Sequence, residues 1–310
     1  MSVTGQPRVE RSRTSLRRRL QKSGSGRWLL RTRPARWVVT RRRQRVTRQL
    51  ARDEPDRFAG VHSCVLLIGH VKSGGTLLGA MLDAHPEIAF ADEVDVVAQL
   101  AAGLDREQVF HLITRASRRE ALGGRVTARR LEPYSLSIPG QWQGRETTLR
   151  VVGDSRAGPT TRALGDHPAQ LVALETALAP ARVVFVHVVR NPFEPIGAMV
   201  RRSGRTVSDA VADHRAQCER LIRIRARLSP ECLYTVRYED LVARPADHLR
   251  GLLSLLDVEI RDDHLAACGA LVQRGPARDR DRIPWTADDL EAVRATIERI
   301  DFLAGYGFDT

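Results

Sequence analysis

The sequence predicts an α/β protein with a mostly parallel central sheet flanked by helices. Four short apolar runs, rich in β-branched residues and bounded by turn residues, are typical of strands buried on both faces; they span residues 64–68, 149–152, 182–189 and 233–236. Segments with helical periodicity separate these runs, and strands that alternate with helices form parallel sheets. We expect one such domain over residues 60–310 of the 310-residue chain.

The first 57 residues form a basic N-terminal tail outside this domain. The tail holds 18 of the 50 Lys and Arg residues but 4 of the 37 Asp and Glu residues, so it carries +14 while the remainder carries −1. We predict a poorly ordered, solvated extension. The alternative is an amphipathic segment on an anionic membrane surface, because Trp28 and Trp37 can enter the lipid interface while arginines meet headgroups. Only these two aromatic residues interleave with the arginines, which disfavours nucleic acid as a partner.

The sequence gives no sign of a membrane span, export or metal. No apolar run approaches the ~20 residues of a transmembrane helix, and the tail lacks the apolar core of a signal peptide. The four cysteines, Cys64, Cys218, Cys232 and Cys268, are far apart and form no C-x-x-C pair. This favours buried free thiols over disulfides or a zinc site. We therefore expect a cytoplasmic, reduced protein.

The remaining elements follow in chain order. Helical periods cover residues 76–84, 94–104, 168–178, 195–202, 207–228 and 246–256, and a short strand-like piece covers 88–90. A last helix is expected to open at Thr286, with Asp289 at the capping-box position. Residues 118–148 have no clear period, and an irregular segment of this length indicates a lid or a substrate-facing insertion.

A glycine-rich loop, G-H-V-K-S-G-G-T, connects the first strand to the first helix. This order of elements binds phosphate or sulfate, because backbone N–H groups and the helix N-terminus face the anion. The P-loop pattern G-x-x-x-x-G-K-[ST] of nucleotide triphosphatases is matched at Gly69 and Gly74, but Gly75 stands in place of the lysine. The cation is instead Lys72, one of two lysines beside 48 arginines. The loop is predicted to bind an anion other than ATP.

Polar side chains also follow the other three main strands. Asp154 and Arg156 follow the run 149–152, Arg190 follows the run 182–189, and Tyr238 follows the last. In an open parallel sheet, ligands bind beyond the carboxyl ends of the strands, and an arginine there can fork onto a phosphate. Each charge alone is explained as well by a solvated strand end or an ion pair. Four such ends at one edge indicate a site.

Three motifs occur in a fixed order: V-K-S-G-G-T-L-L, then H-V-V-R-N-P before a helix, then V-R-Y-E-D-L with a proline after it. Together they resemble the sulfotransferases that use 3′-phosphoadenosine-5′-phosphosulfate (PAPS). The segment S-G-G-T-L-L-G-A-M-L-D-A-H-P-E-I, followed by Asp92 and Glu93, is most similar to the tyrosylprotein and carbohydrate branch. The resemblance implies a P-loop NTPase-like sulfotransferase fold, PAPS as co-substrate, a hydroxyl or amine acceptor, and no metal.

The resemblance also implies a role for each matching residue. The 5′-phosphosulfate would be held by Lys72 and by the loop residues Ser73, Gly74, Gly75, Thr76 and Leu77. Arg190 would hold the 3′-phosphate, and Tyr238 would lie near the adenine. Cytosolic relatives close a late basic loop over the 3′-phosphate, which makes Arg278 and Arg280 further candidates. The usual serine eight residues after the arginine is here Ala198, so one expected phosphate contact is missing.

Sulfuryl transfer is an in-line displacement that depends on positioning and electrostatics. Lys72 is expected to stabilise the leaving-group oxygen, and the acceptor needs a base. Glu93 matches the family's glutamate and is our candidate base, with Asp92 as the alternative; Glu93 could equally be a helix N-terminal carboxylate. Arg156 is expected to contact either the sulfuryl group or Asp154.

Two rival functions remain at this point. The first is a P-loop kinase or NTPase using ATP and Mg²⁺, with Asp154 on the metal. The second is a non-catalytic protein that binds anionic surfaces through its tail. For the enzyme, small-molecule, glycan, lipid and peptide acceptors are all compatible with the same cofactor machinery. The histidines His70, His85 and His187 are expected to be structural.

Overall fold

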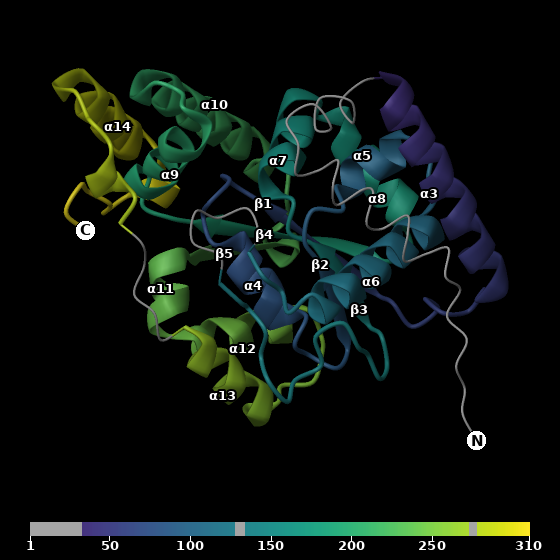
Figure 1. Ribbon diagram of the computed structural model, residues 1–310. Coiled ribbons are helices and arrows are strands. Elements are labelled where there is room, and N and C mark those ends of the chain that lie inside the picture. The colour runs from purple at the N-terminus through teal and green to yellow at the C-terminus, as the bar shows by residue number, and fades with distance from the viewer. Residues whose placement is uncertain (1–32, 128–133, 273–277) are drawn as a thin grey trace. The chain divides into compact units, whose positions relative to one another are not determined.

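The computed structural model describes residues 33–127, 134–272 and 278–310, and in it five parallel strands form one sheet (Figure 1). The strand order is β2-β3-β1-β4-β5. The strands are β1 (Ser63–Ile68), β2 (Ile88–Ala91), β3 (Val151–Asp154), β4 (Arg182–Val189) and β5 (Leu233–Arg237). The predicted α/β fold with a parallel sheet is therefore confirmed. Four of the strand-like segments lie within a residue of their expected bounds, while β3 begins two residues later than the expected run 149–152 and includes Asp154.

Helices cover both faces of the sheet (Figure 1), and every residue of the central strand β1 is therefore buried. Cys64 and Leu66 belong to one hydrophobic core, and Val65 and Leu67 belong to another. The first core receives residues from α5 (Val96–Ala101), α6 (Arg106–Leu122), α7 (Ala157–Asp166), α8 (Ala169–Leu178) and α10 (Val207–Arg225). The second receives residues from α4 (Gly75–Leu82), α11 (Tyr238–Ala243), α12 (Pro245–Leu255) and α13 (Asp262–Leu271).

A third core extends the domain beyond the end of β4. It packs α9 (Phe193–Ser203), α10 and α14 (Ala287–Arg299) around apolar side chains that include Val189. Helix α14 begins with the predicted capping box: the Thr286 side chain accepts the N–H of Asp289, and Asp289 accepts the N–H of Thr286. This box satisfies two helix-end donors that would otherwise lack a partner.

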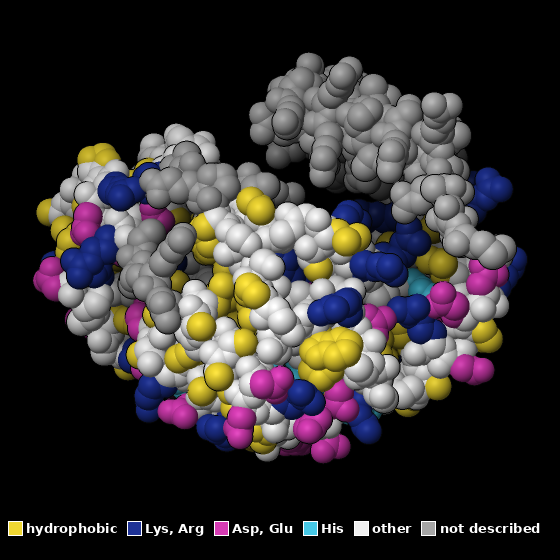
Figure 2. All heavy atoms as spheres, turned by 60° about the horizontal axis from the view of Figure 1, so that its bottom comes forward, with side chains coloured by type: hydrophobic (Ala, Val, Ile, Leu, Met, Phe, Trp, Pro, Cys, Tyr) yellow, Lys and Arg dark blue, Asp and Glu magenta, His cyan; other side chains and the backbone are white. Residues whose placement is uncertain are grey.

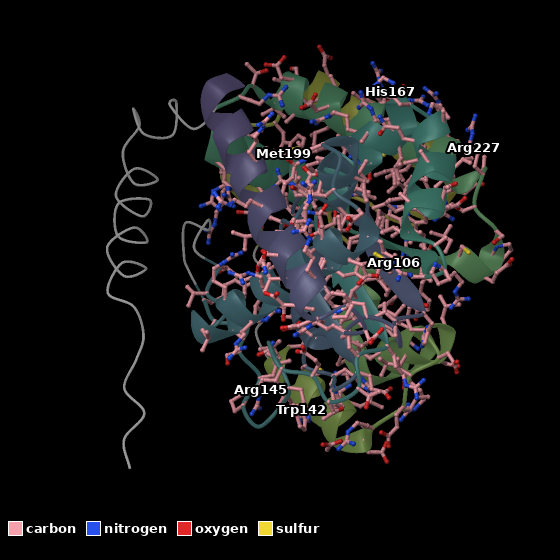
Figure 3. All side chains as sticks on the ribbon, turned by 90° about the vertical axis from the view of Figure 1, so that its right-hand side faces the viewer. Arg106, Trp142, Arg145, His167, Met199 and Arg227 are labelled. Atoms are coloured by element: carbon pink, nitrogen blue, oxygen red, sulfur yellow. The ribbon has the colours of Figure 1, made fainter. Side chains whose placement is uncertain are left out.

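The segment 118–148 is largely fastened to the end of α4. Its first residues belong to α6, and Val126 and Ser135 form an antiparallel bridge. Gly144 donates to the Asp83 carboxylate at 2.9 Å, and other backbone groups bond to the connection between α4 and β2. Trp142 and Arg145 lie together in a cation–π contact of 5.3 Å (Figure 3). Residues 142–147 are thus anchored at the connection between α4 and β2, whereas Glu120, in the same segment, accepts the N–H of Asp92 just after β2. The interpretation of the segment as a lid or a substrate-facing insertion stays a prediction, and residues 128–133 lie outside the described residues.

The basic tail contains a helix that the sequence did not predict. Helix α3 spans Arg33–Asp53, and by compactness the chain divides into the units Met1–Asp53 and Glu54–Thr310. The arginine-rich sequence of α3 has no apolar stripe strong enough to stand out, so the helical period was missed. Within the described residues, no helix combines the length and apolar character needed to cross a bilayer.

Candidate active site

The glycine-rich loop (Gly69–Gly75) turns from β1 into α4 through several left-handed backbone conformations. Lys72 has φ 71° and Gly74 has φ 102°. Gly74 is the N-cap of α4 and provides no side-chain acceptor for the first turn of the helix. The N-terminal N–H groups of a helix attract anions. The loop therefore places Lys72 beside the N-terminus of α4. The N–H groups at this helix end receive no hydrogen bond from an N-cap side chain.

Two side chains that the sequence did not single out hold the start of the loop. The N–H of Gly69 donates to the Thr161 hydroxyl at 2.8 Å, and its carbonyl accepts a hydrogen bond from the Gln217 amide at 3.1 Å. Thr161 lies on α7 and Gln217 on α10. These contacts fix the loop against the helices of one sheet face, and no short-range motif in the sequence indicates them.

Arg190 and Tyr238 meet the loop at the ends of their strands. The ring of Tyr238 lies so close to Gly74 that a Cβ there would come within 2.2 Å of it, which excludes any other residue at this position without a shift. The Arg190 guanidinium lies 4.5 Å from the centre of the same ring and donates to the carbonyl of Lys72 at 2.9 Å. The ends of β1, β4 and β5 thus converge on one cluster, as the parallel sheet predicted.

Glu194 links two of the three arginines that were predicted for the 3′-phosphate. It lies 3.5 Å from Arg190 and 3.3 Å from Arg280, and all three side chains are buried. Burial raises the pKa of Glu194, while the N–H of Asp279 and the two arginines oppose this rise. Arg280 also donates to the carbonyl of Thr310 at 2.7 Å. The site therefore holds a shared carboxylate between its cations, which the sequence analysis missed although Glu194 follows Arg190 by one helical turn.

The other two positions of this region are Arg278 and Ala198. Arg278 is exposed just before Arg280, in the part of the chain that follows the undescribed residues 273–277. Ala198 is buried on α9, at the place of the usual serine. The neighbouring Gly197 approaches the backbone of Asp279 so closely that a Cβ would come within 2.7 Å of it. α9 therefore packs directly against the segment that carries Arg280.

The candidate base lies at the neighbouring part of the same sheet edge. Glu93 follows β2 with φ 66°, and its carboxylate is 3.3 Å from Arg156. Arg156 is also 3.5 Å from Asp95, the N-cap of α5. The expected alternative of an Arg156–Asp154 pair is wrong: Asp154 is buried and accepts backbone N–H groups of residues 94 and 95 at 2.9 and 2.7 Å. Burial raises the pKa of Asp154 to about 7 against these hydrogen bonds.

Asp92, the alternative base, makes hydrogen bonds through both its carboxylate and its backbone N–H. Its carboxylate accepts a hydrogen bond from the Ser155 hydroxyl, and its N–H donates to Glu120 at 2.9 Å. Burial raises the pKa of Glu120 to about 8. Between the two candidates, Glu93 has the side chain that faces a cation at the sheet edge.

The structural histidines and cysteines lie as expected. His70 donates to the carbonyl of His214 at 2.9 Å, His85 to that of Glu259 at 2.7 Å, and His187 is buried within β4. All four cysteines are free. The free thiols are confirmed, and Cys64, Cys218 and Cys268 are buried as expected, but Cys232 is only half-buried. The hydrogen bonds of His70 and His85 agree with a structural role.

The comparisons with known proteins agree with this geometry. A model described as the sulfotransferase family matches residues 64–263, more than half of the chain. The chain belongs to the sulfotransferase family. A search of the curated proteins finds no match. The branch of the family that the motifs suggested is not established by the family match.

Several solved sulfotransferases are similar to this family member. The sulfotransferase domain from the curacin biosynthetic pathway is 17% identical, with a TM-score of 0.43 over 71% of this chain and 82% of that chain. The sulfotransferase STF9 from Mycobacterium avium is 11% identical, with a TM-score of 0.49 over 84% and 82%. A mouse sulfotransferase whose crystal structure is complexed with PAP is 9% identical, with a TM-score of 0.43 over 79% and 87%.

Proposed function

We propose that this protein transfers a sulfuryl group from PAPS to a hydroxyl or amine acceptor. The observation that carries the proposal is the cluster in which Arg190 stacks on Tyr238 and bonds to the carbonyl of Lys72. This contact places a buried arginine next to a lysine-bearing anion loop. Two separate cationic groups suit a nucleotide with a 5′-phosphosulfate and a separate 3′-phosphate.

The loop fits the leaving-group side of the donor. In sulfuryl transfer, negative charge develops on the oxygen that bridges sulfur and the 5′-phosphate, and a preorganised cation and helix N-terminus stabilise it. Lys72 and the first turn of α4 supply these two groups, and Ser73, Thr76 and Leu77 are their neighbours in the loop. The residues present therefore match the chemistry of the donor.

The 3′-phosphate side involves Arg190, with Arg280 and Arg278 as further candidates. Glu194 lies between Arg190 and Arg280 and forms ion pairs with both. A phosphate bound there would interact with guanidinium groups that also pair with this carboxylate. The part of the Tyr238 ring that Arg190 and Gly74 do not cover is the proposed contact for the adenine. Arg280 is the proposed substitute for the missing hydroxyl at Ala198, because the segment that carries it packs against Gly197 of α9.

Glu93 is the proposed general base. Its ion pair with Arg156 at 3.3 Å holds the carboxylate at the sheet edge, where the acceptor has to meet the sulfuryl group. Arg156 is then a positioning residue. Small-molecule, glycan, lipid and peptide acceptors all remain compatible with this arrangement, as do a cytoplasmic location and a contact of the tail with anionic membranes.

The kinase alternative is less well supported. Both carboxylate oxygens of Asp154 accept backbone N–H groups, which leaves this group poorly placed to coordinate Mg²⁺. An absolute Mg²⁺ requirement for turnover would favour the kinase. The non-catalytic alternative predicts that deleting residues 1–57 abolishes function, whereas the enzyme is expected to retain turnover with a soluble acceptor.

Isothermal titration calorimetry with PAP and with ATP tests the proposal. We expect PAP to bind more tightly than ATP, and Lys72→Ala and Arg190→Met to weaken PAP binding by tenfold or more, about 1.4 kcal/mol. Arg145→Met is the matched control, because Arg145 also stacks on an aromatic ring but lies on the anchored segment. Absence of PAP binding, or tighter binding of ATP, contradicts the proposal.

A further inference from the structure

Three potential metal ligands meet behind the anion loop, outside the proposed sulfuryl-transfer site. His70 lies two residues before Lys72, and His214 and Cys218 lie one turn apart on α10. The Cys218 Sγ atom is 3.7 Å from His70 Nε2 and 3.7 Å from His214 Nδ1. All three ligand atoms lie within 4.8 Å of one another.

The spacing of these atoms suits a tetrahedral metal ion. With bonds of about 2.3 Å to sulfur and about 2.0 Å to imidazole nitrogen, the sulfur–nitrogen edges of such a site are roughly 3.5 Å. The two edges of 3.7 Å therefore require little movement. The imidazole rings of His70 and His214 are stacked, with centroids 3.8 Å apart and planes inclined by 15°. Because an imidazole binds a metal in its own plane, the His70 ring has to turn out of this stack for both nitrogens to point at one ion.

We propose that His70, His214 and Cys218 form a binding site for a thiophilic transition-metal ion of the zinc class. Imidazole and thiolate together are the ligands that such ions prefer. Three protein ligands leave the fourth position to water. The site goes beyond sulfuryl transfer and would tie the anion loop to α10.

The protonation states define what metal binding has to change. Burial lowers the pKa of His70 to about 4 and that of His214 well below its usual range, so both rings are neutral, as ligands must be. Burial raises the pKa of Cys218 to about 12. Binding therefore releases the thiol proton to solvent as the metal–sulfur bond forms. At His70, the proton on Nε2 moves to Nδ1, and the metal replaces the hydrogen bond to the carbonyl of His214.

A second histidine–cysteine pair in the domain provides a natural control. His264 and Cys268 are also one turn apart, on α13, with Nε2 and Sγ 3.4 Å apart. Both groups face the carbonyl of Met81, at 2.8 and 3.7 Å. Within the described residues, the only three-ligand group of this kind is the one at His70. The pair on α13 is therefore expected to bind no metal tightly.

Titration of the full-length protein with cobalt(II) tests the site, because a cobalt–thiolate bond gives a charge-transfer band and tetrahedral cobalt gives strong visible bands. We expect one cobalt per chain, displaced by zinc. Cys218→Ser should abolish the charge-transfer band, and His70→Gln should weaken binding at least tenfold, while Cys268→Ser should bind as the wild type does. Zinc should also raise the melting temperature of the wild type and of Cys268→Ser.

Several outcomes would overturn the site. They are the absence of a charge-transfer band in the wild-type protein, retention of the band in Cys218→Ser, and loss of the band in Cys268→Ser with the fold intact by circular dichroism. His70→Gln keeps the test decisive if Cys218→Ser does not fold, because glutamine can still donate to the carbonyl of His214. Unchanged cobalt affinity in His70→Gln would show that His70 is not a ligand of the metal.

Discussion

At the scale of single residues, backbone strain gathers at one edge of the sheet. Five non-glycine residues in the described chain have positive φ, and three of them are Lys72, Glu93 and Asp95. Such conformations cost about 1–3 kcal/mol each and persist only where neighbours enforce them. Asp154 binds the N–H of Asp95, and Arg190 binds the carbonyl of Lys72. The surroundings thus stabilise an arrangement in which a cation and a carboxylate are displayed at the same edge.

Replacing Glu93 tests the assignment of the base. Glu93→Gln keeps the size of the side chain but removes its ability to accept a proton, so kcat is expected to fall about 10²–10⁴-fold. PAP affinity should change little, because a general base is expected to contact the acceptor rather than the donor. Single-turnover sulfation and PAP calorimetry separate the two effects. A larger loss in Asp92→Asn than in Glu93→Gln would move the base to Asp92.

The roles of individual residues could be predicted only in part. Lys72, Arg190 and Tyr238 stand directly after strands, so the parallel sheet alone brings them together. Glu194, Thr161 and Gln217 reach the site because α9, α7 and α10 pack against the loop. That packing depends on contacts between distant segments, which no local pattern records.

At the scale of elements, one buried carboxylate joins four parts of the domain. Asp83, at the end of α4, accepts the N–H of Phe90 in β2 and the hydroxyl of Ser117 in α6, both at 2.6 Å. It also pairs with the buried Arg125 and accepts the N–H of Gly144. Burial raises the pKa of Asp83, and Arg125 opposes the rise.

Removing this carboxylate should be costly. Asp83→Ala leaves Arg125 buried without its counter-charge, so the free energy of unfolding is expected to fall by about 3–5 kcal/mol. Asp213→Ala is the control, because the Arg205–Asp213 pair is exposed and such pairs contribute about 1 kcal/mol or less. Urea denaturation of both variants measures the difference. Equal, small losses would show that Asp83 does not hold these elements together.

The elements themselves were predictable where their signals were local. The strands are apolar and β-branched, and Thr286 with Asp289 marks the start of α14. Helix α7 was missed because its first residues, Ala157 to Pro159, resemble a loop, and α6 because its exposed face is rich in arginine. In both, packing on the sheet outweighs weak local preference.

At the scale of the whole molecule, the chain beyond the tail is close to electrically neutral. Acidic and basic side chains are interspersed over the face in Figure 2, in keeping with the net charge of −1 beyond residue 57. The isoelectric point of about 10.8 thus reflects the tail. Interactions of this domain with anions are therefore expected to depend on local clusters such as Lys72 and Arg190 rather than on a global field.

The buried Asp154 and the half-buried Glu120 predict a pH dependence of stability. The pKa values of Glu120 and Asp154 are raised by burial to about 8 and about 7, whereas both groups titrate near pH 4 in an unfolded chain. Between pH 6.5 and 8 the folded protein keeps protons that the unfolded chain has lost. The free energy of unfolding therefore falls as pH rises, by at most about 1.4 kcal/mol per pH unit for each group.

The buried histidines do not offset this trend. Their pKa values are lowered, so their contribution to stability rises with pH only up to about 6.5. Urea denaturation at several pH values from 6.5 to 8 measures the slope. Glu120→Gln should flatten it, while the exposed Glu291→Gln should not. A flat wild-type profile would contradict the raised pKa values.

The strand order has a consequence for the synthesis of the protein. Both neighbours of β1 come later in the chain, since β1 pairs with β3 and β4 and not with β2. The fully buried segment Ser63–Ile68 therefore leaves the ribosome long before Val151–Asp154 can pair with it. Until then its apolar side chains and backbone groups are open to other chains. The central strand of the finished sheet is thus a part of the nascent protein that we expect chaperones to protect.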